Sequence, residues 1–423
     1  MTMDLRQAFA GLLTLSMFMM LGNMIKKDHF DSTDVNIPAT AVGQYGAVGV
    51  TGQSLATVSH LSKGHLEGLK PCWNPPASKE AKQTNGFVTF SLTNGPEYHL
   101  SQVADAVVIA RYLGATLVIP DIKGSKPGYK MNFGEIYDVD KFINSLDRLV
   151  EVTKTRPPQA SNGKVPLARV PKRVSEHYIV TKIQPIFKST GVIKIESYFP
   201  SVNVTMVAEK KNMDSFACEA MFGSLQLQPE MQEVADSMIR KLKTWSQNLN
   251  GEFVAVDLNT EVLDKMGCNR RGDTGKKMCY QAQEVGQFLN KIGLSQETAI
   301  YVTQPRWHAD LDALRDIFPK TFTKENVMPS AKKGKFLNSE SSEFEKAIDF
   351  YICSQSDVFV PSAPGLWYEN VAGVRIGSGK TQILVPDETE SASASPSDYI
   401  SPYVSQKNHF AYSCFCEHPA KTL

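Results

Sequence analysis

Short apolar runs and amphipathic segments alternate along the second half of the chain. Uninterrupted apolar runs are typical of strands that are buried on both faces of a parallel sheet, whereas apolar residues spaced by three or four are typical of helices. On this basis we expect strands at residues 253–256, 299–303, 321–322, 357–360 and 381–385, and helices at 280–292, 308–318, 342–353 and 367–374. This repeated β–α order indicates a Rossmann-like unit.

The same alternation starts, less regularly, at residue 86. Residues 86–90 form an apolar run, residues 97–113 carry apolar side chains on one helical face, and Gly114 is a typical helix-ending residue before a second run at 115–120. Further helices are expected at 133–149 and 229–245, and an irregular loop at 156–173. We therefore predict an α/β protein with two Rossmann-like domains facing a cleft, at 81–247 and 248–390, and a C-terminal extension at 391–423.

The N-terminal region has a different pattern. Residues 8–25 (AFAGLLTLSMFMMLGNMI) are apolar and uncharged, which meets the lower length limit of a membrane-spanning helix. A cleaved signal peptide is the alternative, but Lys26 and Lys27 follow the apolar run where a small-x-small cleavage site would be needed. We expect a cytosolic tail at 1–7, an uncleaved signal anchor at 8–25 and a polar stem at 26–80.

The charges around this segment leave its orientation open. Arg6 precedes the apolar run and two lysines follow it, so the positive-inside rule is balanced or slightly against a lumenal C-terminus. The sequence Asn203-Val204-Thr205 is an N-glycosylation sequon, which favours a lumenal position. We predict Asn203 as a glycosylation site.

Composition excludes some classes of protein. The 45 Lys and Arg residues balance 44 Asp and Glu residues, so a broad basic surface for nucleic acid is not expected. No GxGxxG sequence follows the first strand of either half, which argues against a nicotinamide-dependent dehydrogenase.

The seven cysteines form no CxxC pair, so neither a zinc ribbon nor a thioredoxin motif is expected. Cys268 and Cys279 flank a short loop rich in Gly, Arg and Lys and are a disulfide candidate in an oxidising compartment. Cys353 lies in an apolar run and is the best candidate for a free, buried thiol.

Several sequence segments resemble one family over nearly the whole chain. The Asn94-Gly95 pair, the run from Ala110 to Pro120 and the run from Ser356 to Pro361 resemble the plant O-fucosyltransferase-like family. Within it, the mannan-synthesis-related subgroup is similar in the segments MTMDLRQAFAGLL, SLTNGPEYH, PDIKGSKPG, SYFPSVN, AMFGSLQLQPE, TQPRW, DIFPKTFTKE and HFAYSCFC.

The resemblance implies a GT-B fold and a type II anchor in the Golgi membrane with the catalytic region in the lumen. It also implies a nucleotide-sugar donor, a polysaccharide acceptor and a role in cell-wall mannan or glucomannan synthesis. A GDP-sugar such as GDP-fucose or GDP-mannose is favoured over a UDP-sugar. No metal or other cofactor is expected, and the DxD spacings at 138–140 and 310–312 fall in helical segments where capping is the simpler interpretation.

The family's Gly-Gly-Leu-Asn-Gln loop corresponds to residues 94–99, which are one residue shorter here. Asn94 and Gly95 match and are expected at the donor. Glu97 and His99 do not match and are additional polar candidates, with His99 assigned to donor binding. For Glu97 the alternative is a favourable charge in the first turn of a helix.

The family pattern His-Leu-Arg after the first strand of the second domain reads Asp257-Leu258-Asn259 here. Asn259 cannot supply the cation that would neutralise a departing diphosphate, although it stays a donor-binding candidate. Arg306 is the first substitute by position, and Arg375 and Lys380 are the next. Asp257, at the end of a strand, is the candidate base for the acceptor hydroxyl, with a structural ion pair as the alternative.

The family's late motif is matched by Asp349, Ser356 and Asp357, which the resemblance assigns to the nucleotide's base and ribose. Gly365 also matches, but Leu366 replaces the asparagine that follows it in the family. Two hypotheses therefore stand: a sugar transferase of mannan assembly, and a non-catalytic, transferase-like partner that supports the mannan synthase.

Overall fold

A computed structural model describes residues 69–73, 84–124, 126, 128–155, 157–158, 165–199, 213–247, 250–268, 277, 279–337, 342–387 and 395–417. The predicted cytosolic tail, membrane anchor and most of the stem lie outside these residues, as does the predicted glycosylation site Asn203. Among the described helices, none has both the length and the apolar character that crossing a bilayer requires. All the described residues belong to one compact unit.

The first sheet is built around β2 (Phe87–Thr93), whose five central residues are all buried. Strand β2 pairs in parallel with β3 (Thr116–Val118), β4 (Asp121–Lys123) and β8 (Val192–Tyr198). Three short strands extend the sheet, namely β5 (Lys130–Asn132), β6 (Val152–Thr153) and β7 (Leu167–Pro171). Only β5 is antiparallel to its neighbour.

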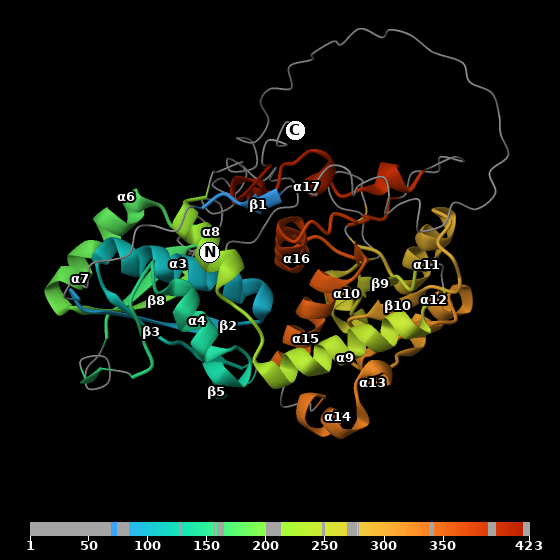
Figure 1. The fold of residues 1–423 in the computed structure, drawn as a ribbon, viewed down its shortest axis with the longest axis horizontal. Helices are drawn as coiled ribbons and strands as arrows, with labels where there is room; N and C mark the ends of the chain where they lie inside the picture. The colour runs from blue at the N-terminus through green and yellow to red at the C-terminus, as the bar shows by residue number, and fades with distance from the viewer. Residues whose placement is uncertain are drawn as a thin grey trace, which may run out of the picture. The chain divides into compact units, whose positions relative to one another are not determined.

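The longest helix of this half, α3 (Pro96–Leu113), follows β2 directly and ends at Gly114, whose φ of 63° is the left-handed conformation that glycine adopts readily. Figure 1 shows α3 above the strands β2 and β3. The other helices of this half are η1 (Phe133–Glu135), α4 (Val139–Leu146), α6 (Glu176–Tyr178), η2 (Ile179–Ile183), α7 (Gln184–Thr190) and α8 (Ser215–Gly223).

The second sheet contains four parallel strands in the order β11 (Thr321–Phe322), β10 (Ala299–Val302), β9 (Phe253–Asp257) and β12 (Val358–Pro361). Alternate residues of β9 face different cores. Phe253 and Ala255 pack in a core that continues into the first half, whereas Val254 and Val256 pack in a separate core. A strand buried on both faces explains why its sequence is continuously apolar.

Helices cover both faces of this sheet. Helix α9 (Pro229–Trp245) and α15 (Ser342–Gln355) contribute to the shared core, and α11 (Ala282–Lys291) and α12 (Asp312–Ile317) to the separate one. The remaining helices of this half are α10 (Thr260–Met266), η3 (Ala309–Leu311), α13 (Lys324–Val327), α14 (Ser330–Phe336) and α16 (Leu366–Gly377).

Three local predictions need correction. The predicted loop at 156–173 contains strand β7, which pairs with β8 at the edge of the first sheet. Strand β8 was itself not predicted, so the sequence offered no partner for β7. The predicted helix at 133–149 is divided into η1 and α4, with Asp138 capping α4 through a bond from the Lys141 amide. The predicted strand at 381–385 makes only the isolated bridges Phe359–Ile383 and Leu384–Ile400.

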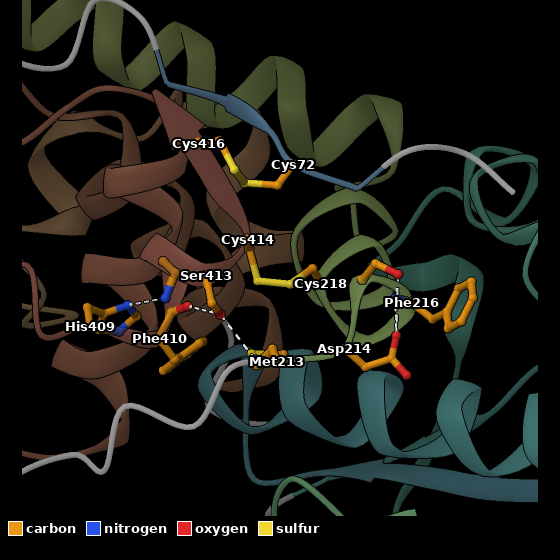
Figure 2. Close-up of a disulfide and its surroundings, with 12 residues drawn as sticks. Cys72, Met213, Asp214, Phe216, Cys218, His409, Phe410, Ser413, Cys414 and Cys416 are labelled. Carbon is orange, nitrogen blue, oxygen red and sulfur yellow. Dashed lines mark hydrogen bonds between the residues drawn. A yellow bond between two sulfur atoms is a disulfide. The ribbon is translucent and has the colours of Figure 1, made fainter. Parts of the chain in front are cut away.

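The C-terminal extension contains η4 (Pro396–Tyr399), α17 (Pro402–Ser405), η5 (Phe410–Ser413) and β13 (Phe415–Glu417), and β13 pairs antiparallel with β1 (Leu69–Pro71). The predicted Cys268–Cys279 disulfide is confirmed, and Cys353 is a free, buried thiol as predicted. Two long-range disulfides, Cys72–Cys416 and Cys218–Cys414, were not predicted, because a spacing of hundreds of residues leaves no local pattern (Figure 2).

Candidate functional site

The carboxyl ends of the second sheet bring polar side chains together around Asp257, the last residue of β9. The Thr303 hydroxyl, just after β10, donates to Oδ1 of Asp257 at 3.2 Å, and the Ser362 hydroxyl, just after β12, donates to the Asp257 carbonyl. Because side chains after neighbouring parallel strands meet at one edge, this is the position where α/β proteins commonly bind ligands.

The Asp257 carboxyl is tuned to exchange a proton near neutral pH. Its pKa is raised to about 7, mainly by burial; the charge of Asp349 also raises it, whereas the hydrogen bond from Thr303 and the charge of Lys324 lower it. An acid or base works best when its pKa is near the working pH. Asp257 therefore lies at the ligand-binding edge of the sheet with a pKa near neutral pH.

The head of α3 brings a turn of the first half to the helices of the second half. Asn94 and Gly95 both have positive φ values, of 72° and 141°. The Asn94 carbonyl accepts a 3.0 Å hydrogen bond from Nζ of Lys346 in α15, and the Glu97 carbonyl accepts a 2.5 Å bond from Nδ2 of Asn370 in α16. The turn is therefore held from both sides by the second half.

The Glu97 side chain lies in the same electrostatic environment as Asp257. Burial raises the pKa of Glu97 to about 7, the charge of Lys346 lowers it and the charge of Asp257 raises it. Its buried Oε2 has no hydrogen-bond partner among the described residues. A buried oxygen without a partner is costly, so a ligand hydroxyl or amide would be stabilised there.

Glu345 in α15 is a third buried carboxyl group with a raised pKa. Burial raises its pKa to about 7, and the charges of Lys324 and Arg306 oppose this shift. Its Oε2 also lacks a partner within the described part of the chain. No sequence pattern pointed to Glu345, since a charged residue in the first turn of a helix is ordinarily solvated.

His99 is placed inside the core rather than on an open surface, which corrects its expected role in donor binding. Its side chain is 1% exposed, and its Nδ1 is hydrogen-bonded to the Tyr137 hydroxyl at 2.7 Å. Burial lowers the pKa of His99 to about 3, so the ring is neutral at physiological pH. It supports the head of α3 from within.

Asp349 is likewise buried, which corrects its expected contact with the nucleotide. It accepts a 2.6 Å hydrogen bond from the Tyr301 hydroxyl and forms an ion pair with Lys324. Nζ of Lys324 also donates to the Thr303 carbonyl at 3.1 Å. The pair therefore fixes the end of β10, where Thr303 in turn holds Asp257, and acts on the site indirectly.

Ser356, Asp357 and Arg375 lie at the opposite, amino-terminal edge of the sheet, so we do not retain them in the candidate site. Asp357 precedes β12 and accepts a 3.0 Å hydrogen bond from the Phe253 amide at the start of β9. The fully buried guanidinium of Arg375 donates to the Ser356 hydroxyl and to four carbonyls, those of Cys353, Ser356, Asp357 and Gln382. It stabilises the loop around β12 and has no exposed face for a ligand.

Asn259 and Arg306 stay at the carboxyl edge. Asn259 caps α10, since its Oδ1 accepts a 3.3 Å hydrogen bond from the Val262 amide. Arg306 is exposed after β10, and its Nη2 donates to the Leu337 carbonyl at 2.9 Å. Lys346 is the cation that sequence reasoning missed, because only the fold brings α15 beside the turn at Asn94.

The described residues contain no group of three or more His, Cys, Asp or Glu side chains arranged to hold a metal ion. The carboxyl edge therefore presents protonatable carboxyl groups together with separate cations. Such a set can accept a proton from a hydroxyl and can bind an anion.

Comparisons with known proteins define the class. The family model described as "GDP-fucose protein O-fucosyltransferase" matches residues 99–376, and the chain belongs to this family of glycosyltransferases. The predicted family is thereby confirmed.

Among individual relatives, the chain is 59% identical over 421 residues to "Protein MANNAN SYNTHESIS-RELATED" of Trigonella foenum-graecum, covering 98% of this chain and 100% of the relative. It is 50% identical over 427 residues to "Protein MANNAN SYNTHESIS-RELATED 2" of Arabidopsis thaliana, with the same coverage. Solved structures with weaker similarity include POFUT1 in complex with GDP, at 14% identity and a TM-score of 0.44 over 72% of this chain and 99% of that one. NodZ from Bradyrhizobium is 12% identical with a TM-score of 0.41, over 72% and 94%.

Proposed function

We propose that this protein is a glycosyltransferase of GT-B type that acts in mannan or glucomannan synthesis, with a nucleotide sugar as donor and a polysaccharide as acceptor. The observation that carries the proposal is the position of the Asp257 carboxyl at the carboxyl edge of the second sheet, where it accepts a hydrogen bond from Thr303 and interacts electrostatically with Glu97 of α3; burial raises its pKa to about 7. The names of the relatives support a role in mannan synthesis, and the description of the family supports a GDP-sugar as the donor.

In this proposal Asp257 accepts the proton of an acceptor hydroxyl as that oxygen attacks the anomeric carbon of the donor. The bond from this carbon to the donor's diphosphate breaks, and the diphosphate leaves with the electron pair. Lys346 stabilises the negative charge of the diphosphate, and the exposed Arg306 is the second candidate for this role. Gly95 has a φ of 141° that favours glycine and so shapes the turn before α3 on the donor side, and Asn94 and Asn259 offer neutral contacts. No metal is required.

We further propose a Golgi lumenal location with a single-pass type II anchor. Six of the seven cysteines form disulfides, which persist in oxidising compartments and are rare in the cytosol. Residues 8–25 would be the anchor and Asn203 a glycosylation site.

The experiment is a donor and acceptor panel with the full chain in detergent. Turnover of GDP-mannose, GDP-fucose and UDP-glucose would be measured on manno-oligosaccharides. Asp257→Asn should lower kcat by at least about a hundredfold with little change in donor affinity. The matched control is Asp264→Asn, an exposed carboxyl on α10. Full turnover by Asp257→Asn would exclude its role as the base.

A second candidate function is a non-catalytic partner of the mannan synthase. The observation in its favour is Asn259, a neutral helix cap at the position where the family pattern has arginine. Donor binding by the wild-type protein without turnover on any acceptor, together with co-purification of the synthase, would support this candidate over the first.

A further inference from the structure

The C-terminal extension lies between helices from the two halves of the protein. On the side of the first half, Cys414 is bonded to Cys218 in α8, and the Met213 amide donates to the Ser413 hydroxyl at 3.1 Å. On the other side, Nε2 of His409 lies 2.9 Å from the Glu369 carbonyl in α16. Figure 2 shows the Cys218–Cys414 bond together with the hydrogen bond between Met213 and Ser413.

Two glycines of α16, Gly373 and Gly377, allow the extension to pack closely against this helix. A Cβ atom at Gly373 would lie 2.8 Å from Cε1 of His409, and one at Gly377 would lie 2.5 Å from the ring of Phe415. Residues four apart lie on the same face of a helix, so these two glycines form one continuous surface. Any side chain there would displace the extension.

The first half contacts both α16 and the extension. The Glu369 carboxylate accepts bonds from Lys172 at 2.8 Å and Arg173 at 3.1 Å, and the Arg173 guanidinium lies 4.6 Å above the ring of Phe410. The Phe222 ring of α8 lies 6.0 Å from that of Phe410. Phe410 is therefore enclosed by residues of the first half while its neighbour His409 binds α16.

A second disulfide fastens the end of the extension. Cys416 in β13 is bonded to Cys72, and β13 pairs with β1 over three residues. Cys414 ends the helical turn η5, whereas Cys416 lies in β13, and the two sulfurs bond to different partners, Cys218 and Cys72.

We propose that residues 401–417 are a disulfide-fastened latch that holds α16 against the first half and so keeps the head of α3 in place. The link to α3 is Asn370, the residue after Glu369, whose side chain binds the Glu97 carbonyl. A dithiol that reduces Cys218–Cys414 transfers two electrons and two protons, leaves two cysteine thiols and becomes a disulfide itself. Opening this bond loosens the contact between α3 and α16 while both sheets stay folded. This inference does not depend on the proposed transferase activity.

The test is hydrogen–deuterium exchange of the full chain. In the Cys218→Ala/Cys414→Ala variant, amides at the start of α3 and in α16 should exchange about tenfold faster than in the wild type, and those of β9 and β10 should be unchanged. The control is Cys268→Ala/Cys279→Ala, which removes a disulfide within the second half and should leave α3 and α16 unchanged.

A second pair of variants keeps all the disulfides. Gly377→Ala should reproduce the faster exchange of α3 and α16, whereas Gly334→Ala in α14, where a Cβ would meet nothing within 4 Å, should not. If faster exchange is confined to residues 401–417, the extension is only a tethered tail and the proposal is wrong. Faster exchange throughout both sheets would also overturn it, because the disulfide would then support folding in general.

Discussion

Nζ of Lys346 donates a 3.0 Å hydrogen bond to the Asn94 carbonyl, which joins two residues 252 positions apart. Lysine has three donors, and within the described part of the chain Lys346 forms no ion pair and no other hydrogen bond. A cation with free donors is therefore held at the turn before α3. This arrangement makes Lys346 a better candidate for an anionic ligand than Arg306, whose Nη2 donates to the Leu337 carbonyl.

Replacing Lys346 by methionine should therefore weaken the binding of GDP by about tenfold or more, because a charge-assisted hydrogen bond is lost. Arg306→Gln should weaken it less, and Lys346→Arg should keep most of the affinity. Titration calorimetry with GDP measures all three. A large loss in Arg306→Gln with normal binding by Lys346→Met would reverse the assignment.

The rate of a reaction that uses Asp257 as base should rise with pH and level off above about 7, because only the ionised carboxylate accepts a proton. The hydrogen bond from Thr303 lowers this pKa, so Thr303→Val should move the midpoint of the profile to higher pH. Turnover measured from pH 5 to 9 tests both statements. A profile that is flat, or that Thr303→Val shifts downward, would contradict them.

Asp105 provides a test of stability against pH. Burial raises its pKa to about 7, although it accepts bonds from the Val174 amide and the Ser197 hydroxyl. The folded state therefore holds a proton that the unfolded state has released above its pKa near 4, so the contribution of Asp105 to stability falls as pH rises from about 4 to 7.

Asp105→Asn should remove this dependence and raise the free energy of unfolding at pH 8 relative to that at pH 5 by on the order of 2 kcal/mol. Urea unfolding at the two pH values measures the difference. The exposed Asp264→Asn is the control and should leave the pH dependence as in the wild type.

Arg375→Met should destabilise the fold by about 3–5 kcal/mol, because several buried carbonyls lose their donor. The exposed Arg240→Met on α9 should have little effect. Thermal or urea unfolding distinguishes them. A stable Arg375→Met protein that has lost donor binding would restore the role that the sequence suggested for this residue.

Cys353 should resist alkylation in the folded protein, because burial raises the pKa of its thiol well above the usual value. Peptide mass spectrometry without reduction should recover the pairs Cys72–Cys416, Cys218–Cys414 and Cys268–Cys279. Rapid labelling of Cys353 under native conditions, or any other pairing, would contradict the arrangement.

The local pattern of apolar and polar residues was enough to predict most strands and helices of the second half and those at the centre of the first half. Helix α9 and strand β11 occur at the predicted residues, and β9, β10, α11 and α15 differ from prediction by a few residues at their ends. The helices are buried on one face, which gives apolar residues a helical spacing, and the strands are buried on both faces, which gives continuous apolar runs. Strand β8 was missed because half-buried positions weaken that pattern.

The residues of the candidate site also fall into those that local sequence could predict and those that it could not. Asp257 was predicted because a polar residue directly after a buried strand lies at the carboxyl edge wherever the strands are parallel. Ser356, Asp357 and Arg375 were misplaced, since a linear motif does not tell which end of a neighbouring strand a side chain stabilises. Asp349 and His99 were misplaced because the sequence does not reveal the hydroxyls of Tyr301 and Tyr137 that bind them in the core.

Sequence patterns alone were sufficient to predict the α/β class, the order of the strands and helices in the second half, the family and the position of Asp257. Each of these depends on neighbours along the chain or on local motifs. Only the tertiary structure decided that Lys346 reaches Asn94, that Asn370 reaches Glu97, and that Cys414 pairs with Cys218. These contacts join residues 196 to 273 positions apart, and the packing of the two halves, rather than any local preference of the backbone, brings them together.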